Sequence, residues 1–587
     1  MTQKWDNTQE WNEKRIGEDY NNTIGYYATT DLNWSMYNGN QWVGVKTNGL
    51  PKMTMPICQQ AIDYIISSIL SRPLAAEYNA DNIPEPPPAP QDGQDSFKNM
   101  QNRELRKTIK NLTLAADMKW EKEKMDAKLR ALLLDAANSG DMCIHVYWDS
   151  RVNTRQFEQG DFKAEVIDGA NVMFGNPNTP EVSCQPYIII VGREVVSKLK
   201  AEAKANGVSK ELRDRIEPDE NTEYQIGERG KTELTGNDNE TKKATYVIKY
   251  WRDEESGHIF WNKSTQYCPI RKSVDTMLTR YPVVWGNWRS IKNSYHGNSA
   301  TGAIVDNQIA INQMFAMVVY WMRMSAFGKT IIDSSRIPVW SNKIGEVIKA
   351  DGNVDNIVKQ LQSGNFNSAI LEVINLAIKY TKDFVGANEA ALGQINPERT
   401  SGTAIMMTAK QAAIPHENVL AHLEQFVEDL YLVWGDCFLK KYNSRTLYFR
   451  DEKTKRMDSF DYNSAELSDV LLSCKVNVGP STIWSETLLL QNLDNLLARQ
   501  AITPRQYFER IAPLNILPDV QGLIADAKLK EMQDALQAQA EQQMALAGVK
   551  VNKSTGGVEP SNIPELQGAN GNLAQNDLRA SQPAHGQ

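Results

Sequence analysis

Side chains that could bind a metal or act as nucleophiles are scattered along this chain. Its six histidines and six cysteines never occur at a metal-ligand spacing such as CxxC or CxxH. His416 and His422 are six residues apart, so a helix would place them on different faces. Single, scattered cysteines are typical of reduced, mostly buried thiols in a protein made in a cytosol. We therefore expect no metal or other cofactor.

One stretch imitates the phosphate-binding loop of nucleotide-binding proteins. Gly328-Lys329-Thr330 ends like such a loop, but Arg323 stands where the loop requires its first glycine. The motifs of serine hydrolases, zinc proteases, calcium loops and dinucleotide folds do not occur. The carboxylates fall mostly on helix faces that we expect to be solvated. The sequence thus favours a structural subunit over an enzyme, with an unrecognised carboxylate site as the alternative.

Composition and charge narrow the class of protein further. The 587 residues are 41% hydrophobic and 23% charged, which fits several domains around a sizeable core. A net charge of −8 argues against a basic protein that wraps DNA or coats a membrane. Such a charge still permits DNA to pass through, because a conduit should avoid tight phosphate contacts. We find no uninterrupted apolar run of about 18 residues and no signal peptide, so no membrane span is expected.

The element that the rest of the chain must support is a helix within residues 296–327. A Gly/Asn/Ser turn leads into it, and no proline interrupts it. At 100° per residue, one stripe holds Ile304, Gln308, Ile311, Phe315, Val318 and Met322. Asp306 and Gln313 lie opposite. Residues 314–322 are apolar on nearly every side, so we expect protein to enclose this end, as in a buried core helix.

A second helix, at about 368–385, has one apolar face and exposes Lys379 and Lys382. Between the two helices lies an insert with expected strands at 328–338 and 346–351. The two helices can therefore pack antiparallel around a small β excursion.

The first half of the chain is expected to be mixed α+β. Polar residues 1–30 carry spaced aromatics, typical of an arm on a neighbouring subunit or of an amphipathic surface helix. A long helix is expected at 97–138. Alternating segments then predict strands at 142–149, 162–168, 171–177, 187–193, 244–253, 257–263 and 281–289.

The second half begins with a loop rich in small residues at 386–402, which either adjoins something that moves or is a plain connector. Residues 403–441 predict one long helix with a kink at Pro415. Strands at 446–451 and 471–480 could complete the earlier sheet. Helices are expected at 483–500, 503–514 and 519–548, followed by a disordered tail at 549–587.

This order resembles the portal proteins of tailed bacteriophages, the head-to-tail connector family. The phrases that carry the resemblance are MYNGNQW, GLPKMTMPICQQAIDYI, NVMFGNP before YIIIVGR, and YPVVW followed by YHGNSATGAIVDNQIAINQMF. The likeness covers about residues 30–548. It implies an α+β subunit divided into an arm and wing at 1–295, stem helices at 296–327 and 367–385, a clip at 328–366, a tunnel loop at 386–402, a kinked helix and wing return at 403–482, and a helical crown at 483–548.

The resemblance also implies a function. Portal subunits form a ring, usually of twelve, at one capsid vertex of the virion, after assembly in the host cytoplasm. Double-stranded DNA passes through the ring during genome packaging and ejection. The implied partners are the major capsid protein, the large terminase, a head–tail adaptor, and scaffold or ejection proteins. A helical scaffold or adaptor protein without a DNA channel is the alternative.

The resemblance places two groups of residues. Asn388, Glu389, Gln394, Asn396, Glu398 and Arg399 would lie beside DNA in the tunnel loop. Arg399 could contact a phosphate or form a salt bridge to a neighbouring subunit. Asp306, Gln308, Gln313, Phe315, Lys379 and Lys382 would belong to the stem. The polar start of the first stem helix would face either the channel or the junction between stem and wing.

Overall fold

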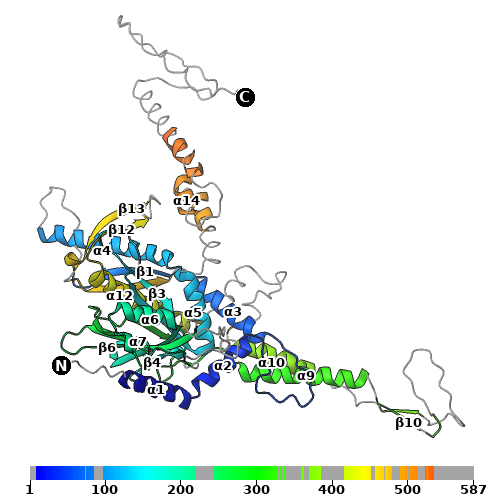
Figure 1. Ribbon diagram of the computed structural model, residues 1–587. Helices are drawn as coiled ribbons and strands as arrows, with labels where there is room; N and C mark the ends of the chain where they lie inside the picture. Colours follow the sequence, from blue (N-terminus) through cyan, green and yellow to red (C-terminus); the bar gives the residue numbers. More distant parts are fainter. Residues whose placement is uncertain are drawn as a thin grey trace, which may run out of the picture. The chain divides into compact units, whose positions relative to one another are not determined.

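The computed structural model describes most of the first 478 residues and parts of the remainder (Figure 1). The described residues are 8–72, 74–84, 97–219, 242–326, 329–333, 335–337, 358–361, 369–384, 386, 416–450, 457–467, 470–478, 490, 492–499, 501–511, 522–524 and 526–533. The chain divides into two units, Met1–Thr482 and Ile483–Gln587, which are described separately.

Helices and strands mix in the first unit, which confirms the α+β class. Its helices are α1 Thr8–Thr23, α2 Tyr26–Tyr37, α3 Ile57–Leu70, α4 Phe97–Lys122, α5 Met125–Ser139, α6 Val196–Ala205, α7 Lys210–Arg213, α9 Val305–Ala326, α10 Ala369–Phe384 and α12 Glu417–Lys441. Its strands are β1 Leu74–Ala80, β2 Asp141–Asp149, β3 Asp161–Val166, β4 Val172–Phe174, β5 Tyr187–Val195, β6 Lys243–Arg252, β7 Ile259–Ser264, β8 Pro269–Asp275, β9 Val283–Asn287, β10 Lys329–Ile332, β11 Val358–Leu361, β12 Ser444–Arg450, β13 Met457–Asn463 and β14 Leu472–Val478.

The alternating segments of the first half form two antiparallel sheets. One has the order β3-β2-β9, and the other is the five-stranded meander β4-β5-β6-β7-β8. Side chains on both faces of β2 are buried from Asp141 to Val146 because helices and the second sheet cover them. The expected strands before residue 290 are confirmed, and β8 is an addition.

The strands that return late in the chain do not complete the earlier sheets, so that prediction was wrong. Among the described residues, β12 pairs with β13. Strand β14 pairs with β1, from Leu74 opposite Val478 to Ala80 opposite Leu472. Strand β1 was not predicted, because its sequence LAAEYNA has small residues and no clear alternation. Strand β1 nevertheless follows α3 directly in the chain, and its backbone forms the ladder with β14.

The long helix expected at 97–138 is two helices. Lys124 takes a left-handed backbone conformation with φ of 53°, which ends α4 and redirects the chain into α5. The indole of Trp120 donates to Asp126 Oδ1 across this break at 2.8 Å. The redirection allows α5 to bury Leu129, Leu132 and Leu133 against the sheet β3-β2-β9.

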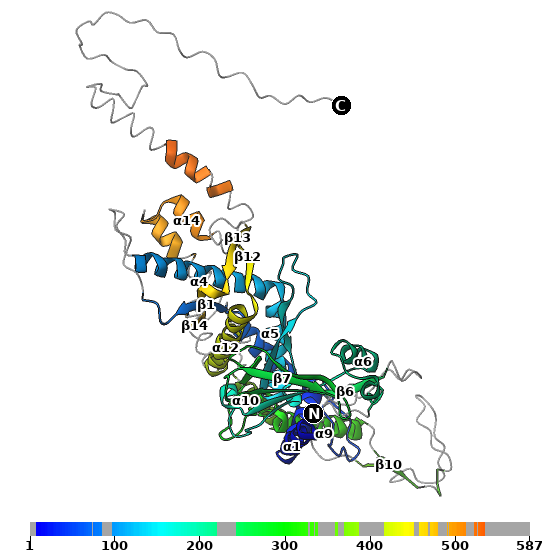
Figure 2. The ribbon, with the colours of Figure 1, turned by 60° about the vertical axis from the view of Figure 1, so that its left-hand side comes forward.

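Helix α12 lies at the centre of the largest hydrophobic core (Figure 2). Its buried side chains include Phe426, Leu430, Trp434 and Phe438, at helical spacing. They pack with residues of α3, α4, α5 and β2. The expected helix is confirmed from Glu417 onward, while residues 403–415, including the predicted kink at Pro415, lie outside the described residues.

The aromatic N-terminal segment packs on its own chain. Glu13 Oε2 of α1 pairs with Lys249 Nζ of β6 at 2.6 Å, and Asn262 Nδ2 of β7 donates to Glu10 Oε1 at 2.6 Å. Trp11 packs against the hydrophobic cluster on the same face of the five-stranded sheet. Of the two interpretations of this segment, the structure therefore agrees with the amphipathic surface helix.

The second unit is helical in its described parts. Residues 492–498, α14 Pro504–Ile511, and residues 526–533 fall within the three expected helices. Arg505 pairs with Glu509 at 2.9 Å, and Tyr507 donates to Asp494 at 2.6 Å. The tail at 549–587 lies outside the described residues.

Candidate functional site: the paired helices α9 and α10

Helix α9 is 22 residues long, or about 33 Å. It begins at Val305, and the residues before it pack on the strand β2. Gly140 and Gly297 approach closely there, because a Cβ at Gly140 would collide with the carbonyl group of Gly297. The segment 296–327 thus begins with the expected turn, and the helix follows it from Val305 to Ala326.

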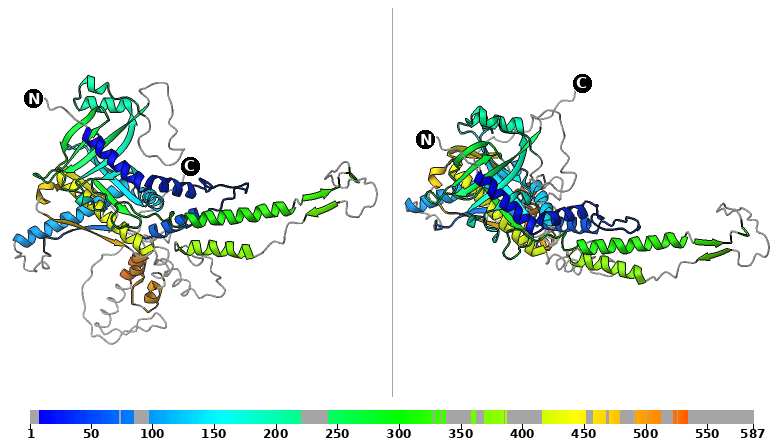
Figure 3. Two further views of the ribbon diagram at one scale, coloured as in Figure 1. Left: turned by 90° about the horizontal axis from the view of Figure 1, so that it is seen from below. Right: turned by 60° about the horizontal axis from the view of Figure 1, so that its bottom comes forward.

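Helix α10 lies beside α9, and the strands β10 and β11 pair antiparallel beyond the end of α9 (Figure 3). Ile311 and Val318 of α9 and Ile374 of α10 are buried in the shared cluster. Met314, Phe315, Ala377 and Ile378 pack against it. The expected pairing of the two helices is confirmed. The second strand of the insert was expected at 346–351, which lies outside the described residues, and β11 follows at 358–361.

A buried network of side-chain amides joins the base of α9 to α3 and the segment before it. Gln308 Oε1 accepts from the backbone N–H of Cys58 at 3.2 Å, and Gln308 Nε2 donates to Asn312 Oδ1 at 3.1 Å. Asn312 Nδ2 donates to Gln41 Oε1 at 2.8 Å. Gln41 Nε2 in turn donates to the carbonyl of Met55 at 3.0 Å. The network fixes how α9 leaves the body of the unit.

The predicted stem residues do not gather into one site. Gln308 is fully buried at the base, so the structure places it at the junction rather than on an open face. Asp306 and Lys379 are exposed, and Lys382 and Gln313 are half-buried. Phe315 packs between the two helices.

Large apolar side chains remain exposed on both helices. Their exposed fractions lie between 37% and 73%, and they are Met317, Tyr320, Met322, Met324, Ile370, Leu371, Val373, Leu376, Tyr380 and Phe384. Within this chain, α10 covers one side of α9 and leaves Met317, Tyr320 and Met322 exposed, so the single chain does not enclose residues 314–322 by itself. Full burial of one such side chain is worth about 1.5–3 kcal/mol. An apolar surface of this extent marks an interaction site.

Residues 213–463 match the family model described as Phage P22-like portal protein. The match confirms the resemblance to tailed-phage portal proteins. It runs from α7 to β13 and includes α9 and α10. No curated protein matches the chain. Within the described residues, no helix of this portal-like chain is long and apolar enough to cross a membrane.

A buried polar cluster supports the turn that leads into the portal-like helix pair. His296 Nδ1 lies 2.5 Å from Asp141 Oδ2, and its Nε2 lies 2.8 Å from Asn21 Oδ1. Tyr26 donates to the same Asp141 oxygen at 2.7 Å. Burial, together with the charge of Asp141, raises the pKa of Tyr26 well above its ordinary value. This cluster ties α1, α2, β2 and the turn before α9 together.

Two largely buried carboxyl groups, those of Asp135 and Asp168, lie near that cluster. Burial raises the pKa of Asp135 to about 7, and the charge of Asp168 adds to the shift. Burial also raises the pKa of Asp168 to about 6, although the N–H of Ala170 donates to it. Sequence reasoning missed this region, because the only local signal was the Ser139-Gly140-Asp141 helix end.

The residues that the resemblance placed beside DNA cannot be located. Asn388, Glu389, Gln394, Asn396, Glu398 and Arg399 all lie outside the described residues. Among the residues that are described, no group of three or more His, Cys, Asp or Glu side chains could hold a metal ion.

Proposed function

We propose that this chain is the portal subunit of a tailed bacteriophage and forms a ring at one capsid vertex. The observation that carries the proposal is the family match over 213–463, which includes the helix pair with its exposed apolar side chains. The family supports a phage portal role in the virion. The resemblance implies a ring of about twelve subunits.

The helix pair supplies a physical reason for assembly. A single chain leaves large apolar side chains of α9 and α10 in water, and a second copy could cover them. Heterologous contacts of this kind close into a ring when the rotation between copies divides a full turn. The amide network at the base of α9 would hold every stem at the same angle, which ring closure requires.

The ring would conduct double-stranded DNA during packaging and ejection. Asn388, Glu389, Gln394, Asn396, Glu398 and Arg399 are proposed to face the DNA, with Pro415 at a kink in the following helix. Small, polar and acidic side chains make few lasting phosphate contacts, so DNA could slide. The large terminase and the head–tail adaptor would dock at the strands β10 and β11, and the major capsid protein would surround the ring.

The test is the size and shape of the purified protein. Each chain has a mass of 66.2 kDa. Native mass spectrometry should show a closed assembly of about twelve chains, and negative-stain images should show a ring with a central hole. A protein that stays monomeric or dimeric at micromolar concentration would refute the portal assignment and favour a scaffold or adaptor without a channel.

A further inference from the structure

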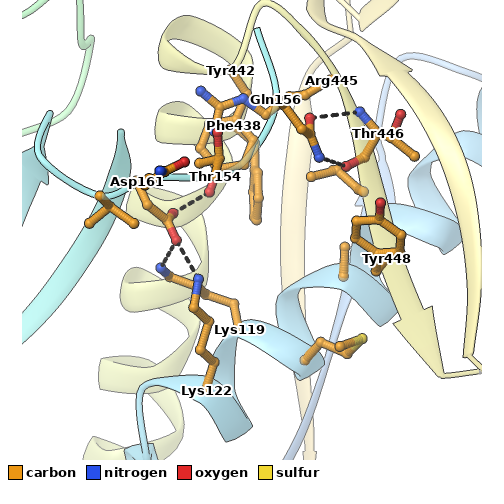
Figure 4. A pocket seen from close by; sticks show the side chains of 15 residues that line it. Lys119, Lys122, Thr154, Gln156, Asp161, Phe438, Tyr442, Arg445, Thr446 and Tyr448 are labelled. Atoms are coloured by element: carbon orange, nitrogen blue, oxygen red, sulfur yellow. Dashed lines mark hydrogen bonds and ion pairs between the residues drawn. The ribbon is translucent and has the colours of Figure 1, made fainter. Parts of the chain in front are cut away.

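A cavity lies between α4, the loop that joins β2 to β3, the end of α12 and β12 (Figure 4). Its volume is about 390 Å³. The loop is held to β12 by Gln156, whose Nε2 donates to the carbonyl of Thr446 at 2.8 Å and whose Oε1 accepts from the N–H of Thr446 at 3.2 Å. These two hydrogen bonds fix the position of the loop, so one wall of the cavity is held in place.

Positive charge exceeds negative charge around this cavity. Lys119, Lys122 and Arg445 line it, whereas Asp161 is its one lining carboxylate. The ammonium groups of Lys119 and Lys122 each lie 2.9 Å from Asp161 Oδ2, and the hydroxyl of Tyr442 also donates to Asp161. Burial alone would raise the pKa of Asp161, but Lys119, Tyr442 and Lys122 together lower it, so this carboxyl group is ionised.

Neighbouring carboxylates reduce the excess of positive charge but do not remove it. Glu123, just outside the cavity, lies 3.3 Å from Lys119 Nζ but also pairs with Lys128 at 2.9 Å. Asp461 lies beside the lining residue Thr446, whose hydroxyl donates to its Oδ1 at 2.9 Å. Three carboxylates therefore stand against four cations, which leaves a formal excess of one positive charge, and Arg445 is the cation for which the described residues supply no carboxylate partner. The local charge is thus positive, whereas the whole chain has a net charge of −8.

Arg445 is the lining residue whose N–H groups most clearly lack hydrogen-bond acceptors. Its side chain is 7% exposed, and its Nη1 donates to the carbonyl of Gly160 at 3.0 Å. The guanidinium group lies 4.1 Å from the ring centre of Tyr442 and 5.6 Å from that of Trp148. Its Nε and Nη2 are buried and have no hydrogen-bond acceptor among the described residues. A buried N–H group without an acceptor costs free energy, which an anionic ligand would recover.

We propose that this cavity binds a small organic phosphate. Arginine and lysine together are the side chains that best hold a phosphate group, since guanidinium offers two parallel N–H donors. Lys122 is 64% exposed, so its ammonium group is open to a ligand while it still contacts Asp161. Met118, Leu447 and the half-exposed ring of Tyr448 line the cavity and would contact an apolar or aromatic moiety.

The size of the cavity decides between a bare phosphate and a larger molecule. Cavities of about 300–1,000 Å³ typically hold small organic ligands. A bare phosphate would leave the apolar wall in contact with water. A nucleoside monophosphate combines one phosphate with one aromatic ring system and is the simplest probe of this chemistry. The proposal is independent of ring formation and goes beyond the proposed function.

The test is isothermal titration of the full-length protein with AMP, inorganic phosphate, adenosine and succinate in parallel. AMP should bind most tightly, because it alone supplies both moieties. Lys122→Ala should weaken AMP binding by about tenfold, the loss expected for one charge-assisted hydrogen bond. Lys163→Ala is the control, since the side chain of Lys163 is 39% exposed, pairs with Asp149 at 2.7 Å and does not line the cavity. That control should bind AMP as the unaltered protein does.

Several results would overturn the proposal. One is the absence of heat at millimolar AMP. Equal binding of phosphate and AMP would refute an organic ligand, and equal binding of adenosine and AMP would refute a phosphate site. Tighter binding of succinate would point to an acidic side chain of a partner protein instead. Tyr448→Ala, at an exposed position, should weaken AMP binding but leave phosphate binding unchanged; an unchanged AMP affinity would contradict the assigned apolar wall.

Discussion

The imidazole of His296 lies 2.5 Å from the carboxylate of Asp141, and both side chains are at most 2% exposed. The carboxylate also accepts from Tyr26, from Asn287 Nδ2 at 2.8 Å and from the N–H of Gly297 at 2.8 Å. Every oxygen of this buried carboxylate is thus satisfied. The pair connects the start of β2 to the turn before α9, so it supports the position of α9.

Asp141→Asn should destabilise the protein by about 3 kcal/mol, because an amide places an N–H group against donors and removes the charge that faces His296. Urea-induced unfolding followed by circular dichroism measures the loss. Asp149→Asn is the control, since that carboxylate forms a surface pair with Lys163 and should matter by less than about 1 kcal/mol. Equal losses in the two variants would contradict the role given to Asp141.

Asp135 should make the protein less stable as the pH rises from about 4 to 7. Its pKa in the folded protein is about 7, above the ordinary value of 3.8, so its contribution is fully present at low pH and is lost as the pH passes through 7. Asp135→Asn removes this dependence. The stability of the variant relative to the unaltered protein should therefore rise between about pH 4 and 7, by at most about 1.4 kcal/mol per pH unit, and should stay level above pH 7. If the melting temperatures of the variant and the unaltered protein differ by the same amount at every pH, the shifted pKa is refuted.

Gln308→Leu should loosen the base of α9. The substitution leaves the N–H of Cys58 without its acceptor and removes a donor to Asn312, at a cost of about 2–3 kcal/mol. Hydrogen exchange should become faster in the first turns of α9. Gln313→Leu, at a half-buried position outside the network, should change stability by about 0.5 kcal/mol or less. If both variants exchange alike, the network does not hold the stem.

Leu376→Asp combined with Tyr380→Asp should prevent assembly without unfolding the chain. Both side chains are about half exposed in the single chain, so the charges should be tolerated there but not in an interface between copies. Light scattering after size exclusion should report a monomer, while circular dichroism stays unchanged. Lys379→Gln, on the same helix, is the control and should still assemble. A ring formed by the double variant would rule out this surface as the contact between subunits.

Replacing Glu389 and Glu398 by lysine should slow or stall DNA translocation without blocking ring assembly. Added lysines in the channel would bind phosphates and turn a sliding contact into a salt-dependent one. The length of DNA packaged in vitro is the measure. Charge reversal of the exposed pair Glu254 and Glu255 is the matched control. Normal packaging by the first variant would contradict the assignment of 386–402 to the channel.

Much of the local structure could be predicted from the sequence. The strands β2, β5 and β6 follow from apolar and β-branched residues in short runs, and α9 and α10 follow from helical periodicity and from their turns. Neighbouring residues decide such patterns, because backbone geometry repeats every two or 3.6 residues. The order of these elements carried the resemblance to portal proteins, which the family match then confirmed.

The sites were decided by the tertiary structure. His296 and Asp141 are 155 residues apart, Gln308 and Cys58 are 250 apart, and Arg445 and Gly160 are 285 apart. No spacing in the sequence connects residues at these separations. Burial then strengthens the hydrogen bonds of these groups and makes an unpaired group costly. The same histidine, amide or guanidinium group on an exposed helix would be solvated by water. The sequence alone determined that two apolar helices exist, and only their packing showed which of their apolar side chains remain exposed.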